Sequence, residues 1–72
     1  MAKTHEVGSP VSWAWGNGRG TGTVLQVHTR RVTRSLRGSD ITRNGTGDCP
    51  AYLIETDDGS QVLKLHSEVE AT

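Results

Sequence analysis

Apolar and polar residues alternate over several short runs of this chain, which is the pattern of β-strands that bury one face. The clearest run covers residues 50–66, where Asp58-Gly59 favours a two-residue hairpin turn, because both central positions of a type I′ turn require positive φ. Such a turn pairs Thr56 with Gln61 and fixes which side chains share a face. The predicted core face consists of Tyr52, Ile54, Leu63 and Leu65. The opposite face, which we expect to be half-solvated, consists of Leu53, Glu55, Val62, Lys64 and His66.

Two further strands are predicted before this hairpin. Residues 11–15 alternate, with their apolar side chains on one face, and form the first strand. Residues 16–22 carry a glycine at every second position, and we expect a flexible loop there. A phosphate-binding glycine loop would be followed by a helix, whereas residues 23–29 have the pattern of a second strand. That strand has apolar residues on both faces, which indicates a bend or a partly covered outer face.

Residues 30–45 predict a second hairpin that is rich in arginine. Two short β-like runs, 32–36 and 40–43, flank a connection of about three residues that contains Gly38. Because few of its side chains are apolar, we expect this hairpin to project from the domain or to lie loosely across it. At the other end of the chain, residues 67–70 are predicted to form either one 3₁₀ turn or a short closing strand.

The predicted fold class is all-β: a small SH3-like or Tudor-type five-stranded barrel with an additional Arg-rich β-hairpin. Short strands joined by tight turns favour a small barrel, because closure of the sheet removes its unpaired edges. A chain of 72 residues has a thin core and forms one domain. We expect a single domain over residues 1–72, with a loose N-terminus at 1–6 and the barrel at 7–70.

Cysteine content and hydropathy bear on where the protein works. Cys49 is the single cysteine, so the chain cannot form an internal disulfide, and small secreted domains usually have several. The sequence shows no apolar run of membrane-spanning length and no signal-peptide core after Met1. These features predict a cytoplasmic protein with no membrane partner.

The formal net charge of zero conceals two oppositely charged halves. Residues 19–43 hold six arginines against Asp40, a net charge of +5, whereas residues 48–72 hold six carboxylates against Lys64, a net charge of −5. Either the halves neutralise each other in the folded chain, or they present patches of opposite sign to partners.

Four motifs in order along the chain resemble a known family. They are Gly8-x-x-Val11-x-Trp13, Gly20-x-Gly22-x-Val24, Pro50-Ala51-Tyr52-Leu53-Ile54-Glu55 and Lys64-Leu65-His66-x-Glu68. Together they are similar to the hypervirulence-associated Tudor-domain family of short microbial proteins, over roughly residues 7–70. The resemblance implies an SH3-like Tudor barrel and carries over no enzymatic activity.

A methyl-lysine or methyl-arginine reader, which the word Tudor suggests, is not what this sequence favours. Such readers surround the cation with several aromatic rings. The chain has three aromatic residues, Trp13, Trp15 and Tyr52. We place Trp13 and Tyr52 in the core, which leaves Trp15 as the candidate exposed aromatic, and one ring does not form a cage.

Arginines are the best candidates for a binding site, because a guanidinium group makes bidentate contacts with phosphate. The candidate contacts for a ligand or polyanion are Arg19, Arg30, Arg31, Arg34, Arg37 and Arg43. Two features argue against nucleic-acid binding. They are the acidic half of the chain and the lack of an exposed aromatic pair for base stacking.

The sequence gives little support for a catalytic site or a metal site. His5, His28, His66 and Cys49 lack the short paired spacing of metal ligands, so we predict no metal site and no cofactor. The adjacent Ser67 lies on the opposite side of an extended chain from His66, so the two cannot form a relay. We expect His66 to hold the turn into the last segment through a hydrogen bond, and we predict that the protein is not an enzyme.

The sequence therefore predicts a non-catalytic binding module of unknown ligand. One interpretation is protein–protein interaction or self-association, in which the hairpin adds a strand to a partner or to a second copy in a homodimer. The alternative is a nucleic-acid-binding accessory protein that uses the Arg-rich hairpin, whose affinity would fall steeply with salt.

Overall fold

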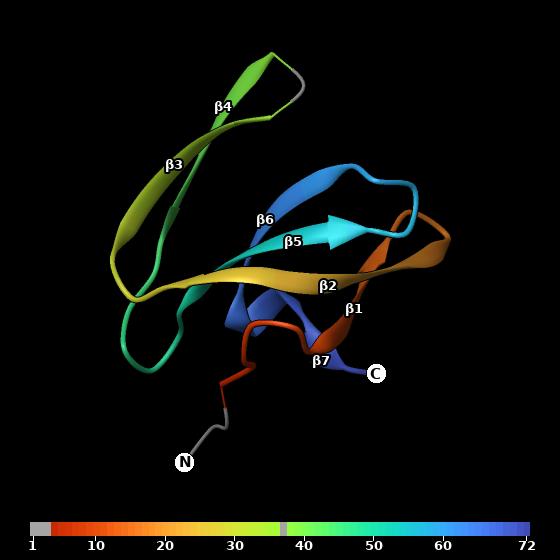
Figure 1. The fold of residues 1–72 in the computed structure, drawn as a ribbon, viewed down its shortest axis with the longest axis horizontal. Coiled ribbons are helices and arrows are strands. Elements are labelled where there is room, and N and C mark those ends of the chain that lie inside the picture. Colours follow the sequence, from red (N-terminus) through yellow and green to blue (C-terminus); the bar gives the residue numbers. More distant parts are fainter. Residues whose placement is uncertain (1–3, 37) are drawn as a thin grey trace.

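The computed structural model describes residues 4–36 and 38–72, which contain seven β-strands and one 3₁₀ turn (Figure 1). In chain order these elements are β1 (Pro10–Trp15), β2 (Gly18–His28), β3 (Arg31–Leu36), β4 (Ser39–Asn44), β5 (Ala51–Thr56), β6 (Gln61–Leu65), η1 (His66–Glu68) and β7 (Glu70–Ala71). The predicted all-β class is confirmed. Of the two alternatives for the last segment, both occur, as a 3₁₀ turn followed by a two-residue strand.

Five of the strands form one antiparallel sheet in the order β6-β5-β2-β1-β7, and β3 and β4 form a separate hairpin. The sheet curls but does not close into a barrel: β6 and β7 are its two edges. The turn η1 runs directly from β6 to β7 and so joins the two edges covalently (Figure 1). The strand β7 has two residues and pairs with β1, so it does not connect the sheet to β6 by a ladder of hydrogen bonds.

The glycine-rich segment is mostly strand, so the predicted flexible loop at 16–22 is wrong beyond its first two residues. The β1–β2 turn consists of Gly16 and Asn17, and β2 begins at Gly18. Gly20 pairs with Trp13 of β1, and a Cβ atom there would lie 2.6 Å from the Trp13 ring. The glycines therefore allow side chains and backbone of neighbouring strands to approach β2 closely.

The β5–β6 hairpin lies where the sequence predicts, but its register differs by one residue. The backbone N–H of Thr56 donates to the carbonyl of Ser60 at 2.7 Å, which leaves a three-residue loop with Gly59 at φ +85°. Three-residue hairpin loops use a left-handed residue at this place. Consequently Leu53, and not Ile54, pairs with Leu63.

The shifted register works because both faces of the sheet are covered. One set of apolar residues, which we call the inner cluster, lies on the face closed by the chain end after η1. It consists of Val11, Trp13, Val24, Tyr52, Ile54 and Val69, with Val62 packed against it. Since Val69 follows η1 directly, the 3₁₀ turn brings an apolar side chain over this face.

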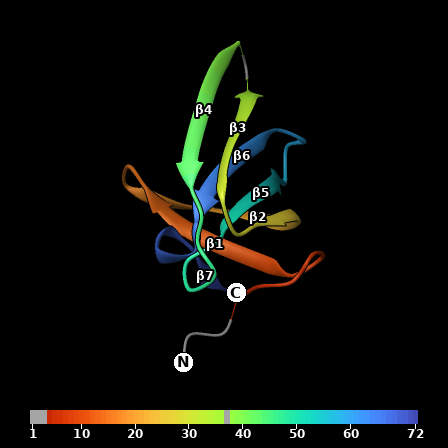
Figure 2. The same ribbon diagram turned by 90° about the vertical axis from the view of Figure 1, so that its left-hand side faces the viewer.

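The second face of the sheet packs against the Arg-rich hairpin. In Figure 2, β3 and β4 lie in front of β6. This outer cluster consists of Val32, Ala51, Leu53 and Leu63, with Leu25, Leu36, Ile41 and Leu65 against it. The β3–β4 hairpin therefore lies against β6 and contributes apolar residues to this cluster from Val32, near its base, to Leu36 at the end of β3. Because both faces of the sheet are covered, β2 has apolar residues on both of its faces. A β-bulge follows Val24.

Candidate functional sites

A hollow lies between the ends of the β1–β2 and β5–β6 hairpins. We call it the Trp groove; its volume is about 620 Å³. Its apolar part comes from Trp13, Trp15 and Val62. Its charged part comes from Arg19, Asp57, Asp58 and Lys64.

Trp15 gives this groove an exposed aromatic wall. Trp13 is 5% exposed and Tyr52 is fully buried, whereas Trp15 is 67% exposed. Both tryptophans lie on β1, but Trp15 is the last residue of the strand and pairs with Gly18, which has no side chain to cover it. The sequence does not reveal that Asp57 and Asp58 would line the same hollow as Trp15, because that juxtaposition depends on how the β1–β2 and β5–β6 hairpins pack together.

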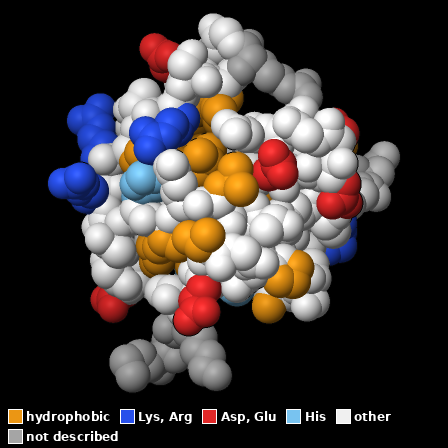
Figure 3. All heavy atoms as spheres, in the orientation of Figure 1, with side chains coloured by type: hydrophobic (Ala, Val, Ile, Leu, Met, Phe, Trp, Pro, Cys, Tyr) orange, Lys and Arg blue, Asp and Glu red, His pale blue; other side chains and the backbone are white. Residues whose placement is uncertain are grey.

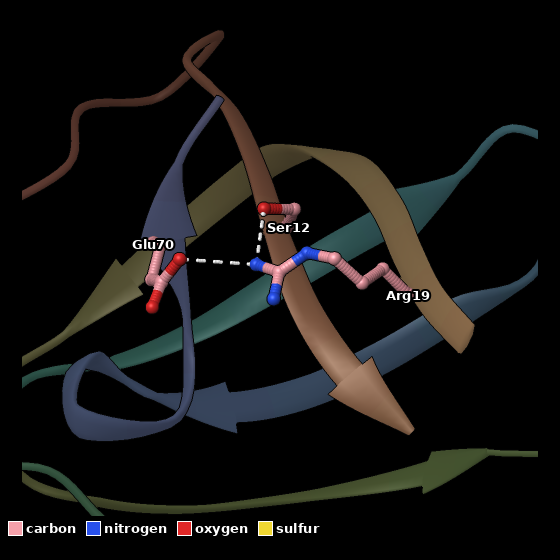
Figure 4. A network of polar contacts seen from close by, with 3 residues as sticks. All are labelled: Ser12, Arg19 and Glu70. Carbon is pink, nitrogen blue, oxygen red and sulfur yellow. Dashed lines mark hydrogen bonds and ion pairs between the residues drawn. The ribbon is translucent and has the colours of Figure 1, made fainter. Parts of the chain in front are cut away.

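Arg19 is held by a network that joins three strands (Figure 4). Its Nη2 atom donates to Oγ of Ser12 at 2.9 Å and to Oε2 of Glu70 at 3.1 Å. Ser12 is a buried polar residue on β1, and Glu70 belongs to β7. This candidate polyanion contact therefore also has a structural partner at the sheet edge, although half of its side chain is exposed.

A second, more polar hollow lies where β2 passes into β3. We call it the arginine hollow; its volume is about 350 Å³, and it is lined by His28, Arg30, Arg31, Val32, Thr33 and Arg34. Basic side chains and a histidine gather on this side of the molecule over β3 in Figure 3. Three of the sequence-predicted arginines thus line one hollow, and His28, which its sequence spacing brought up only as a metal ligand, joins them.

The remaining candidate arginines lie elsewhere. Nε of Arg43 lies 3.4 Å from Oε1 of Glu68, so Arg43 ties β4 to η1. Arg37 lies outside the described residues. The two halves of the chain therefore neutralise each other in part, through Arg43 and Arg19, while the positive charge of the arginine hollow is left on the surface.

Two histidines that are far apart in the sequence meet at Tyr52. The hydroxyl of Tyr52 accepts a hydrogen bond from the backbone N–H of His5 at 2.9 Å and lies 2.9 Å from Nδ1 of His66. The rings of His5 and His66 are 5.1 Å apart. Of the N-terminal segment expected to be loose, residues 1–3 lie outside the described residues, and His5 makes these contacts. The hydrogen bond predicted for His66 at the turn into the last segment is made with Tyr52.

The pKa values in this cluster follow from burial. Burial, and then the neighbouring His66, lower the pKa of His5 below its ordinary value. Burial raises the pKa of the Tyr52 hydroxyl, against the effect of the His5 N–H bond. At neutral pH the His5 ring and the Tyr52 hydroxyl are therefore both uncharged, and the hydroxyl links the N-terminal segment to η1.

Within the described ranges, no group of three or more His, Cys, Asp or Glu side chains is arranged to hold a metal ion. No helix in that part of the chain is long and apolar enough to cross a membrane.

Comparison with known proteins places this architecture in a family. Searches of curated proteins and of solved structures gave no match. A family model described as the TUDOR domain of hypervirulence associated proteins matches residues 8–69, which is nearly the whole chain. The chain, with its curled sheet and its separate β3–β4 hairpin, therefore belongs to the hypervirulence-associated TUDOR-domain family.

Proposed function

We propose that this protein is a non-catalytic module that binds a segment of another protein in the Trp groove. Membership of a Tudor-domain family supports a small binding module in general. The observation that carries the finer proposal is the side chain of Trp15, which is 67% exposed on the wall of a hollow of about 620 Å³. Tryptophan is among the residues that dominate binding energy at protein interfaces, because it buries a large apolar surface.

The shape and charge of the groove suit a polypeptide. The hollow lies between two hairpin ends and combines apolar with charged side chains. The two tryptophans and Val62 contribute its apolar lining, and Asp57 and Lys64 contribute charges of opposite sign. Such a mixture can hold an apolar side chain of the partner while its polar neighbours fix the orientation.

A test uses a random dodecapeptide library displayed on phage and selected on the intact protein. Peptides so obtained are titrated into the ¹⁵N-labelled protein, with the indole N–H signal of Trp15 as the reporter. Trp15→Ala is expected to weaken binding about 30-fold, which corresponds to about 2 kcal/mol for a central interface tryptophan. Val7→Ala is the matched control, because Val7 is similarly exposed, at 65%, and does not line the groove.

Equal binding of the selected peptides to Trp15→Ala and to the unchanged protein would contradict the proposal. Because Trp15 is exposed, its replacement is expected to leave the free energy of unfolding within about 0.5 kcal/mol. A loss of binding can then be assigned to the groove and not to unfolding.

Self-association through the β3–β4 hairpin stays a prediction. All six residues of β3 pair with β4, and the hairpin packs on its own sheet. A strand-exchanged homodimer would re-form these contacts between two copies, and a monomeric mass at high protein concentration would contradict it.

A further inference from the structure

We infer that the arginine hollow is a second binding site, which holds phosphate groups of a nucleic-acid backbone. This inference does not depend on the Trp groove, because the two hollows share no lining residue.

The corner that forms the hollow is held in place by backbone contacts. The N–H of Gly45 donates to the carbonyl of Arg30 at 3.2 Å. Gly45 is buried, and a Cβ atom there would collide with the carbonyl oxygen of His28. The loop after β4 thus packs directly against the backbone of this corner, so its arginines project from a fixed backbone. Preorganisation of this kind lowers the entropic cost of binding.

Among the described residues, no carboxylate forms an ion pair with an arginine of the hollow. Arg34 donates to two neutral acceptors, the carbonyl of Thr33 and Oε1 of Gln26, both at 3.0 Å. In residues 4–36 and 38–72 the ion pairs are those of Arg19 and Arg43, and neither arginine lines the hollow. Arg30, Arg31 and Arg34 therefore keep their charge available to an anion. A guanidinium fork matches phosphate oxygens in geometry as well as in charge.

His28 responds to the same charge. Its Nε2 atom lies 3.0 Å from Oε1 of Gln26 and 3.3 Å from Nη2 of Arg34. Burial, and then Arg34 and Arg30, lower the pKa of His28. A bound phosphate would offset the charge of the arginines and raise this pKa again, so His28 is a built-in reporter of occupancy.

The arrangement favours a chain of phosphates over a single one. Arg34 is half-buried, whereas Arg30 and Arg31 are exposed. The positive charge therefore extends from the hollow out onto the surface of the corner. Successive phosphates of a nucleic-acid strand can meet it there without base-specific contacts.

The test titrates the labelled protein with a ten-nucleotide oligothymidine and, separately, with inorganic phosphate at the same total phosphate concentration. The expected result is a saturable shift of the His28 ring signals and of the amides of residues 28–34, with a rise in the pKa of His28. Contact with three phosphates gives a slope of about −2 in a plot of log K against log salt, since each contact on a single strand contributes about −0.7.

Two substitutions locate the site. Arg34→Gln is expected to weaken oligonucleotide binding about tenfold at low salt and to reduce the salt slope by about 0.7. Arg31→Gln is expected to act similarly, and it removes an exposed side chain, so it keeps the test valid if Arg34→Gln does not fold. Arg43→Gln is the matched control, because it removes the same charge from the same hairpin at a position outside the hollow.

Three results would overturn the inference. They are the absence of saturable shifts, an equal loss of affinity in Arg43→Gln and Arg34→Gln, and inorganic phosphate binding as tightly as the oligonucleotide. Trp15→Ala is expected to leave oligonucleotide binding unchanged, so failure of this inference and failure of the Trp groove are separate outcomes.

Discussion

Replacement of Gly20 by alanine is the sharpest test of how β1 and β2 pack. A Cβ atom at Gly20 would lie 2.6 Å from Cε2, 2.7 Å from Nε1 and 2.8 Å from Cζ2 of Trp13. Ordinary carbon–carbon contacts are about 3.5–4.0 Å, so the indole ring has to move by about 1 Å or β2 has to shift. Trp13 belongs to the inner cluster and is nearly fully buried, so either movement disturbs the core.

The expected loss of unfolding free energy is about 1–3 kcal/mol, which is typical of overpacking in a close-packed interior. For a domain of 72 residues the total is about 4–11 kcal/mol. The substitution therefore removes a large fraction of the stability. The midpoint of thermal unfolding is expected to fall by about 5–20 °C.

The assay is urea denaturation followed by tryptophan fluorescence, with Gly18→Ala as the control. Gly18 lies two residues earlier on the same strand, and a Cβ atom there meets nothing within 4 Å. Gly18→Ala is expected to change stability by less than about 0.5 kcal/mol. If both variants lose the same amount, or neither loses any, the close approach of Trp13 to β2 is wrong and the segment is the flexible loop that its composition suggests.

Further predictions concern the outer cluster, the histidine contact and the Arg19 network. Leu63→Ala truncates a side chain that is 2% exposed between sheet and hairpin, and it is expected to cost about 2–5 kcal/mol in urea unfolding; a cost under about 1 kcal/mol would mean that the hairpin does not cover this face. Because the fold lowers the pKa of His5 below 6.5, the unfolded chain binds more protons there; stability is expected to be full above about pH 6.5 and to fall as the pH drops toward 5. His5→Gln is expected to reduce that fall in a series of thermal melts, and an unchanged series would refute the contribution of His5. Arg19→Ala leaves the buried hydroxyl of Ser12 without its donor and is expected to cost about 1 kcal/mol, whereas Glu70→Ala removes an exposed ion pair alone and is expected to cost less; the reverse order in urea unfolding would contradict the network.

The sequence located the main hairpin correctly and misjudged its register for a local reason. Asp-Gly is a signal for a two-residue turn, but a glycine with positive φ also closes a three-residue loop. The choice between them is decided by which faces are buried. If one face is exposed, Leu53 must point outward; because the β3–β4 hairpin covers that face, Leu53 and Leu63 can pair within a core.

The glycine-rich segment is a second case in which local sequence does not decide the structure. Alternating glycines with polar neighbours have the composition of a loop, and nothing local indicates otherwise. What makes the segment a strand is its cross-strand partner, since Trp13 fills the space over Gly20 and Ile54 that over Gly22. These contacts join distant positions, and composition does not reveal them.

The candidate sites were predictable in kind but not in grouping. Charge sorting along the chain identified the arginines, and the assignment of Trp13 and Tyr52 to the core left Trp15 as the candidate exposed aromatic. Which arginines remain available depended on Glu68 and Glu70, which lie far along the chain and pair with Arg43 and Arg19. Which arginines remain available for a ligand is therefore decided by how distant strands pair.

The register of the β5–β6 hairpin decides both which residues form the two clusters and which line the Trp groove. Cross-strand NOE measurements between the backbone protons of β5 and β6 test it most directly. The account predicts a strong contact between Leu53 and Leu63, together with methyl contacts from Val32 to the outer cluster. A strong cross-strand contact between Ile54 and Leu63 in its place, with no methyl contacts from Val32, would contradict it.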